Sequence, residues 1–223
     1  MSYFLVIISL LVAMWASFNV KHTYKKYSSV LNSRGWTADQ VARKILDENG
    51  LSHVSIERIS GELTEHFDPT SNVVRLSDSV YGKSSVAAIG VAAHECGHAV
   101  QHSQEYAPMK IRRTIIPITN IGSNLAYPLV LLGIILGGNQ LLITIGIWLF
   151  VAVVAFQLVT LPVEFDASGR ALKTLEQSAI LDSDEVKQSR KVLTAAALTY
   201  VAALFTAIAQ LIRLIAISGR RNN

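Results

Sequence analysis

The residues of this chain with the clearest chemical potential are His94, Glu95 and His98, which form an HExxH pattern. Positions four apart on a helix share a face about one turn apart, so both imidazoles can bind one Zn²⁺ beside the intervening glutamate. The pattern also arises by chance, but here it lies in the apolar run SVAAIGVAAHECGHAVQH, which predicts a buried helix over about 84–103. Buried polar side chains need partners, and one catalytic zinc ion would supply them.

A catalytic zinc usually has three protein ligands and one open position, so a third ligand is required. The extended pattern HExxHxxGxxH is absent, because Gln101 and Gln104 stand where its glycine and third histidine would be. We predict Glu164 as the third ligand, since it directly follows a long apolar stretch. Asp166 is the rival, but it faces another direction and can pair with Arg170 four residues later. Both acids could instead serve only to stabilise a helix N-terminus.

The remaining histidines and the cysteine are weaker candidates. His102 lies eight positions after His94, about 12 Å along a helix, which is too far for both to bind one tetrahedral ion. Cys96, two positions from His94, points to another face and is expected to fill the core. Exposed or otherwise bonded positions are expected for His22, His53 and His66.

The distribution of apolar residues predicts an integral membrane protein. The chain has 223 residues, of which 51% are hydrophobic, and no charged residue occurs in 2–20, 114–163 or 192–212. About twenty apolar residues cross a bilayer as a helix, so the middle stretch is long enough for a hairpin of two spans. Four transmembrane helices are therefore expected, at roughly 2–20, 118–136, 141–160 and 194–214.

The basic residues predict the orientation of these helices. Twelve of the twenty Lys and Arg lie between Lys21 and Arg113, and five lie between Arg170 and Lys191. By the positive-inside bias both regions are cytoplasmic, although Arg213, Arg220 and Arg221 would then lie at the outer end of the last span. The first span lacks the basic start of a signal peptide and is expected to stay as an anchor. We expect a multi-pass membrane protein with its active site on the cytoplasmic side.

The fold class expected is mainly α, with about four transmembrane helices and a small cytoplasmic α+β, zincin-like catalytic domain. A helix capped by Thr37 and closed by Gly50 is predicted, followed by a small antiparallel sheet from the runs 53–59, 62–67 and 72–77. Pro162 is expected to separate the third span from a cytoplasmic helix. The expected divisions are a first span at 1–20, a catalytic domain at 21–113, a membrane hairpin at 114–163, a cytoplasmic helical segment at 164–191 and a last span at 192–217.

Two longer strings extend this interpretation through a family resemblance. VRLSDSVYGKSSVAAIGVAAHECGHAVQH and FQLVTLPVEFDASGRALKTLE, in this order between apolar spans, resemble the bacterial neutral zinc metallopeptidases of the YugP type. The resemblance implies a zinc-dependent peptidase of the bacterial inner membrane. More distantly, the plan is similar to gluzincin membrane proteases, in which a later Glu-x-x-x-Asp motif supplies a zinc-binding glutamate. Glu164 and Ser168 occupy the matching positions, so the resemblance supports Glu164, and Ser168 could orient a ligand.

The chemistry expected is hydrolysis of peptide bonds by a zinc-activated water, with Glu95 as the general base. The polypeptide substrate is expected to be a membrane or membrane-proximal protein, cleaved as by an endopeptidase, although exopeptidase action stays open. Tyr81, His66 and Arg170 are conceivable donors to the oxyanion, and the run 72–77 could offer a strand edge to an extended substrate.

Two other classes of function compete with the peptidase. A zinc-stabilised membrane scaffold or adaptor without turnover is the main alternative, but Glu95 has no use at a purely structural zinc. A zinc transporter would need polar residues inside its spans, and apart from Arg213 these carry only uncharged groups. The net charge of +4 comes mainly from residues that flank the spans, so no nucleic-acid partner is expected. The oligomeric state is not determined by the sequence.

Overall fold

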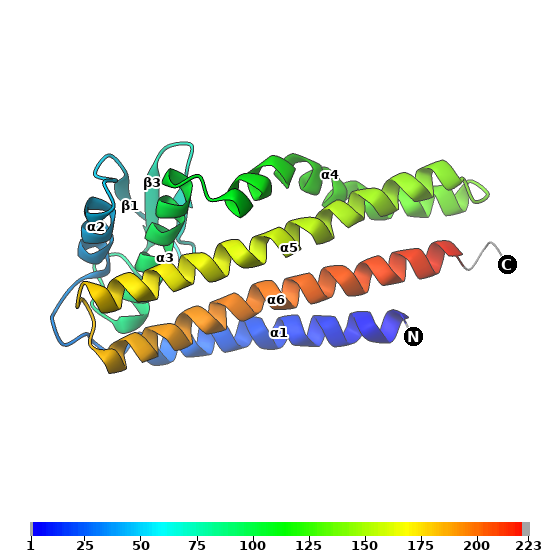
Figure 1. Cartoon of the computed structure of the whole chain (residues 1–223). Helices are drawn as coiled ribbons and strands as arrows, with labels where there is room; N and C mark the ends of the chain where they lie inside the picture. The colour runs from blue at the N-terminus through cyan, green and yellow to red at the C-terminus, as the bar shows by residue number, and fades with distance from the viewer. Residues whose placement is uncertain (1, 220–223) are drawn as a thin grey trace. The chain divides into compact units, whose positions relative to one another are not determined.

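The computed structural model describes residues 2–219 of the chain (Figure 1). Within this range helices dominate, and a small sheet lies between the second and third helices in the sequence. The elements follow in the order α1 (Ser2–Tyr27), α2 (Ala38–Glu48), β1 (Ser55–Ile59), β2 (His66–Asp68), β3 (Val73–Ser77), α3 (Val86–Ser103), α4 (Ala107–Ile135), α5 (Gln140–Gln177) and α6 (Ser183–Gly219).

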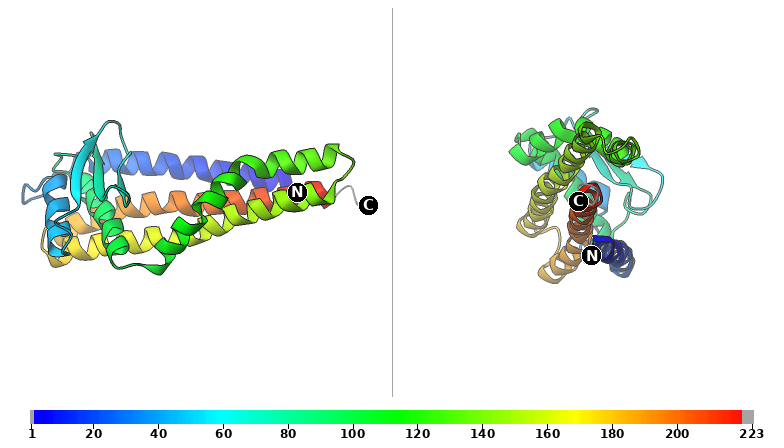
Figure 2. Two further views of the ribbon diagram at one scale, coloured as in Figure 1. Left: turned by 90° about the horizontal axis from the view of Figure 1, so that it is seen from above. Right: turned by 90° about the vertical axis from the view of Figure 1, so that its right-hand side faces the viewer.

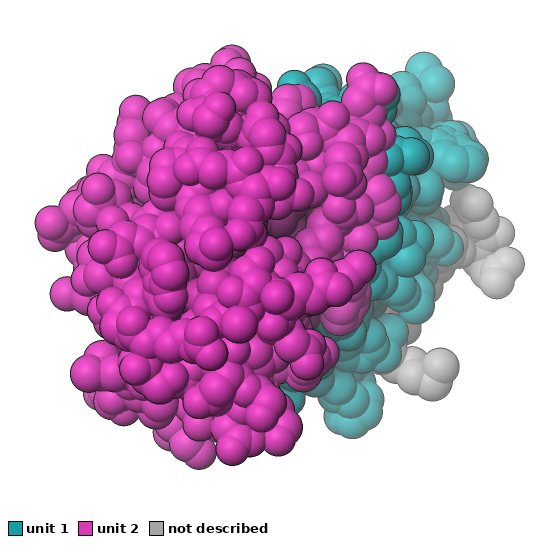
Figure 3. Space-filling model, turned by 60° about the vertical axis from the view of Figure 1, so that its left-hand side comes forward, with its two compact units in different colours: residues 1–17, 107–162, 198–223 teal, residues 18–106, 163–197 magenta. Residues whose placement is uncertain are grey.

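The chain forms two compact units, coloured separately in Figure 3. Three chain segments, 1–17, 107–162 and 198–223, make up unit 1. The other two segments, 18–106 and 163–197, make up unit 2. Three long helices, α1, α5 and α6, thus contribute to both units.

Unit 1 is built from apolar helical segments that run lengthwise beside one another (Figure 2). The Thr206 hydroxyl on α6 donates to the Ser9 carbonyl on α1 at 3.3 Å. Glycine lets α4 and α5 approach closely, since a Cβ at Gly146 would stand 2.8 Å from the Ala126 carbonyl oxygen. Exposed Leu, Ile, Phe and Trp side chains on these helices suit contact with lipid.

The prediction of four spans is confirmed within residues 2–219. Four helices are long and apolar enough to cross a membrane, and each continues beyond the expected span; they are Tyr3–Tyr27, Ala107–Ile135, Gln140–Gln177 and Ser183–Ser218. Arg220 and Arg221, expected at the outer end of the last span, lie outside the described residues.

The expectation that Pro162 separates two helices is wrong, because α5 continues through it without interruption. Proline removes one backbone donor and disturbs a helix locally, but long flanking helical runs can tolerate it. The boundary between units 1 and 2 nevertheless falls between Pro162 and Val163. Glu164 consequently lies on the same continuous helix as the preceding apolar segment.

In unit 2 the helices α2 and α3 pack around one apolar core. The Thr37 N–H donates to the side chain of Gln40 at 3.1 Å, which secures the start of α2, and Gly50 takes a φ of +73° after its end. The Ser85 hydroxyl accepts from the Ala88 N–H at 3.2 Å and caps α3. Both helix starts agree with the sequence expectation.

The sheet differs from the antiparallel arrangement predicted from the sequence. Its order is β1-β3-β2, with β1 parallel to β3 and β2 antiparallel to β3. Strand β2 follows β1 in the chain but does not pair with it. It pairs with β3 on the side away from β1. An alternating pattern of apolar and polar residues predicts a strand but does not predict which strand it pairs with. This explains why the predicted sheet was wrong.

The central position of β3 also overturns one functional expectation. From the sequence, the run 72–77 could have offered an edge to an extended substrate, but β3 is paired on both sides. Strands β1 and β2 form the two sheet edges instead, and the Phe67 N–H of β2 donates to the Glu95 carboxylate at 3.0 Å.

Candidate metal centre

Two helices of unit 2 bring three metal-ligating side chains together. Helix α3 carries His94 and His98 one turn apart, and α5 carries Glu164. The Glu164 Oε2 atom lies 3.3 Å from His94 Nε2 and 3.5 Å from His98 Nε2. The side chain of Glu164 is only 2% exposed, against 14% for His94 and 11% for His98. One donor atom from each residue lies within 4.8 Å of the others.

This arrangement fits a zinc ion. Ligand atoms about 2.1 Å from a tetrahedral ion stand about 3.4 Å apart, close to both measured separations. Two imidazoles and one carboxylate are the donor set of catalytic zinc sites with one open position. Among the described residues, Asp166 is not part of the cluster, and its Oδ2 atom accepts from the Arg170 Nε atom at 2.5 Å. The geometry therefore favours Glu164 over its rival.

Each histidine is held through its second ring nitrogen. The Ser168 hydroxyl lies 3.1 Å from His94 Nδ1, so Ser168 does contact a histidine of the cluster, as expected. The Gln101 Oε1 atom lies 2.9 Å from His98 Nδ1. Such contacts orient the ring and leave Nε2 directed at the position shared with Glu164.

Glycine at position 97 allows α3 and α5 to approach closely enough to form the cluster. A Cβ added at Gly97 would stand 2.7 Å from the carbonyl oxygen of Ala167, which is backbone and cannot swing aside. Ala167 lies between Asp166 and Ser168 on α5, so the close contact is at the level of the cluster. The small residue inside HExxH is thus required by helix packing.

Glu95 is buried beside the cluster, with its carboxylate fixed by the Phe67 amide of β2. Burial by itself lowers the pKa of His98, but the Glu164 carboxylate that accepts from it and the charge of Glu95 raise this pKa above its ordinary value overall. The site thus concentrates negative charge around its imidazoles. A cation is the ligand that such a site would stabilise.

A further carboxyl group near Glu95 was not anticipated from the sequence. Glu65 accepts from the Ser77 hydroxyl at 2.5 Å. Burial raises the pKa of the Glu65 carboxyl, and the charge of Glu95 adds to this effect. Glu65 lies immediately before β2, and no sequence pattern links this segment to α3. Only the fold brings the two together.

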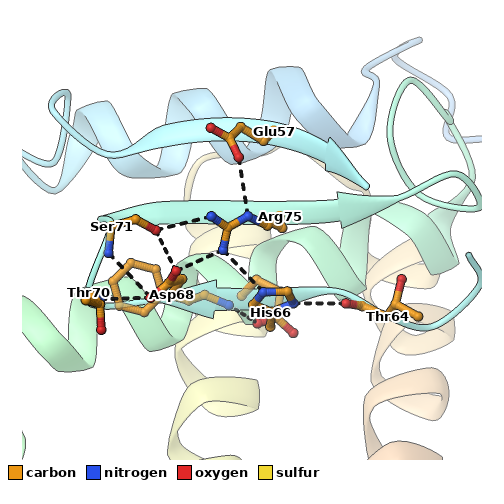
Figure 4. A network of polar contacts seen from close by, with 9 residues as sticks. Glu57, Thr64, His66, Asp68, Thr70, Ser71 and Arg75 are labelled. Atoms are coloured by element: carbon orange, nitrogen blue, oxygen red, sulfur yellow. Dashed lines mark hydrogen bonds and ion pairs between the residues drawn. The ribbon is translucent and has the colours of Figure 1, made fainter. Parts of the chain in front are cut away.

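Among the described residues, the other histidines lie outside the cluster. His66 is exposed, with Nδ1 3.0 Å from the Thr64 carbonyl oxygen and Nε2 3.4 Å from Arg75. Figure 4 shows these contacts within a polar network on β1, β2 and β3. The His102 ring lies 5.7 Å from that of Phe67.

The three conceivable oxyanion donors occupy different surroundings. Arg170 binds Asp166 and Gln104, and His66 belongs to the polar network just described. Tyr81 lines a separate groove of about 760 Å³ along α2. Cys96 is buried with its thiol 3.6 Å from the Ala42 carbonyl, and burial raises the pKa of this thiol, which agrees with a core role.

Gln101 is the residue of this centre that the sequence interpretation missed. It was considered only as the position where a glycine was lacking, yet it is fully buried and contacts His98. A signal was present, because a glutamine three residues after His98 in a buried apolar run needs polar partners.

Comparisons with known proteins place the chain in a family. The family described as "Putative neutral zinc metallopeptidase" matches residues 2–219. The "Putative membrane protease YugP" of Bacillus subtilis (strain 168) is 47% identical over 222 residues, covering 99% of this chain and 98% of that protein. No solved structure matches the chain. Because the family match includes the HExxH helix, the Glu164 helix and all four candidate spans, the chain belongs to the family described as "Putative neutral zinc metallopeptidase".

Proposed function

We propose that this protein is a membrane-bound zinc metallopeptidase that cleaves peptide bonds of membrane or membrane-proximal proteins as an endopeptidase. The observation that carries the proposal is the convergence of His94, His98 and Glu164, with the Glu95 carboxylate buried beside them. A purely structural zinc tends to have four closed protein ligands. Within residues 2–219 the metal-ligating group has three, which favours an open catalytic position.

His94, His98 and Glu164 would hold the zinc. When bound there, Zn²⁺ lowers the pKa of a coordinated water and polarises a scissile carbonyl. Glu95 acts as the general base. Its carboxylate is oriented by the Phe67 N–H, so it can take the proton of the attacking water and pass it to the leaving amine.

The site is proposed to face the cytoplasm at the inner membrane surface. Glu164 follows the expected span 141–160 by four residues on the continuous helix α5. The segments 21–113 and 164–191 carry seventeen of the twenty basic residues and would form the cytoplasmic catalytic part. The spans at 1–20, 114–163 and 192–217 would anchor it in a bacterial inner membrane. Substrate cleavage sites would then lie within or close to the bilayer.

The test combines metal content with cleavage by the full chain in detergent. The wild-type protein should bind one zinc per chain and cleave an unfolded membrane-protein substrate, and a chelator should stop cleavage. Glu95→Gln should retain zinc but lower the cleavage rate by about 10²–10⁴-fold, because the general base is lost. His98→Ala should lose both zinc and cleavage.

Three results would separate the alternatives. Unchanged hydrolysis by Glu95→Gln contradicts the proposed mechanism. Stoichiometric zinc with no cleavage under any condition supports the scaffold or adaptor function instead. Absence of zinc from the wild-type protein contradicts both functions.

A further inference from the structure

A buried glutamine connects the candidate metal centre to a chain of polar contacts on α5. The Gln101 Nε2 atom donates to the Val163 carbonyl oxygen and to Asp166 Oδ2, each at 2.8 Å. Its Oε1 atom lies 2.9 Å from His98 Nδ1. Every polar atom of this amide thus has a partner, although the side chain is fully buried.

These partners determine which way round the amide lies. A backbone carbonyl and a carboxylate can only accept hydrogen bonds, so the NH₂ group of Gln101 must face Val163 and Asp166. The amide oxygen then faces His98, and it can only accept. His98 Nδ1 must therefore carry a proton and donate a hydrogen bond to Gln101, so Nε2 is the ring nitrogen that faces Glu164 and is left to bind a metal.

Asp166 is itself fixed from the side away from the cluster. Arg170 donates through Nε to Asp166 at 2.5 Å and through NH1 to Gln104 Oε1 at 2.6 Å. The guanidinium carbon of Arg170 also lies 5.9 Å from the centre of the Tyr106 ring. Arg170 therefore holds the Asp166 carboxylate in place, and Gln104 and Tyr106 hold Arg170.

The two histidines are supported unequally. His94 Nδ1 contacts the Ser168 hydroxyl, and a hydroxyl can donate or accept. It therefore does not determine the tautomer of His94. The contact to Gln101 does determine that of His98.

We propose that Gln101 is a positioning residue that holds His98 in its Nδ1–H tautomer and so prepares Nε2 to bind the metal, with Asp166 and Arg170 fixing the Gln101 amide. The inference rests on the proposed zinc site of His94, His98 and Glu164. It assigns to Asp166 the role of orienting an amide, in place of the role of a ligand. Partners of this kind change metal affinity by about 10–100-fold when they are removed.

The experiment measures metal binding by the full chain in detergent, independently of cleavage. Zinc affinity is determined by competition with a chromogenic chelator, and Co²⁺ absorption reports the ligand geometry. Gln101→Met keeps the length of the side chain but removes its acceptor and donors. Ser189→Ala is the matched control, because it removes another fully buried hydrogen bond, from Ser189 to the Val86 carbonyl, without touching the cluster.

A second pair of variants tests the polarity of the contact. Gln101→Glu keeps an acceptor for His98 but places a carboxylate against Asp166, which weakens binding by repulsion. Adding Asp166→Asn provides an amide donor to that carboxylate. The double variant should therefore bind zinc more tightly than Gln101→Glu alone, a rescue that loss of packing would not produce.

We expect Gln101→Met to lower zinc affinity by about 10–100-fold and to alter the Co²⁺ spectrum, with Ser189→Ala unchanged in both. Wild-type affinity in Gln101→Met, an equal loss in Ser189→Ala, or no rescue by the double variant would each overturn the proposal. Each of these three results counts against the role of Gln101 only if the wild-type protein binds zinc. If it binds none, the proposed function itself fails.

Discussion

At the scale of single residues, the candidate centre depends on side chains that have very different sequence signals. His94, Glu95 and His98 form a recognisable motif, whereas Glu164 was chosen from its position after an apolar stretch. The structure brings its carboxylate to within 3.5 Å of both imidazoles. Gln101 has no motif, and only its burial and its contacts point to a role.

Gly97 provides a test of the close helix contact. Gly97→Ala places a methyl group 2.7 Å from the Ala167 carbonyl oxygen, so α3 and α5 must separate. We expect a loss of about 1–3 kcal/mol in unfolding free energy, as for other overpacked sites, together with weaker zinc binding. Thermal unfolding in detergent and chelator competition measure the two effects.

Gly169 on α5 is the matched control for this substitution. A Cβ there meets nothing within 4 Å, so Gly169→Ala should stabilise the helix by about 0.5–1 kcal/mol and leave zinc affinity unchanged. Equal stability and zinc affinity in Gly97→Ala and wild type would show that the helices do not need this close approach.

At the scale of elements, the β2–β3 hairpin places Phe67 against Glu95 and is itself held by a polar network (Figure 4). Asp68 accepts from the backbone N–H groups of Thr70 and Ser71 in the connecting turn. It also accepts from Arg75 NH1 at 2.9 Å across the strand pair. These contacts determine where β2 lies, and therefore where the Phe67 amide meets the proposed general base.

The pH dependence of this hairpin follows from Asp68. Hydrogen bonds from Ser71 and Arg75 hold the pKa of Asp68 well below its usual range. A lowered carboxyl pKa adds stability above the unfolded-state pKa of about 3.9, and this is lost as pH falls through the folded-state pKa. Asp68→Asn should therefore lower the melting temperature at pH 7 by a few degrees, and the difference from wild type should shrink below about pH 4.

Glu57→Gln is the control for the Asp68 prediction. Glu57 also contacts Arg75, at 3.3 Å, but its side chain is 53% exposed, so its charge should contribute little. Melting curves of both variants between pH 3 and 7 make the comparison. A constant offset between Asp68→Asn and wild type across this range would contradict a charge-dependent role.

At the scale of the whole molecule, the described residues contain four long apolar helices, and three of them contribute to both units. Helix α5 contributes an apolar segment to unit 1 and then Glu164, Asp166 and Ser168 to unit 2. The metal-binding half-site on α3 is therefore completed by a membrane helix. If the proposed function holds, substrates would be cleaved close to the membrane.

The proposed orientation of the helices in the membrane can be tested by cysteine labelling. The single native cysteine, Cys96, is buried and should not react with the label. Gln140→Cys, next to the turn between α4 and α5, should react with an impermeant maleimide in intact cells. Gln177→Cys, at the end of α5, should react only after the membrane is opened. The reverse pattern would place the metal centre on the outer side.

The sequence by itself determined the features that depend on local order: the four apolar spans, the cap at Thr37, and the shared face of His94 and His98. Periodicity and capping act over a few residues, so these could be predicted. The tertiary structure alone decided that β1 and β3 are parallel, that α5 continues through Pro162, and that Gln101 contacts His98. Each depends on which distant segments pack together, and no local pattern specifies that choice.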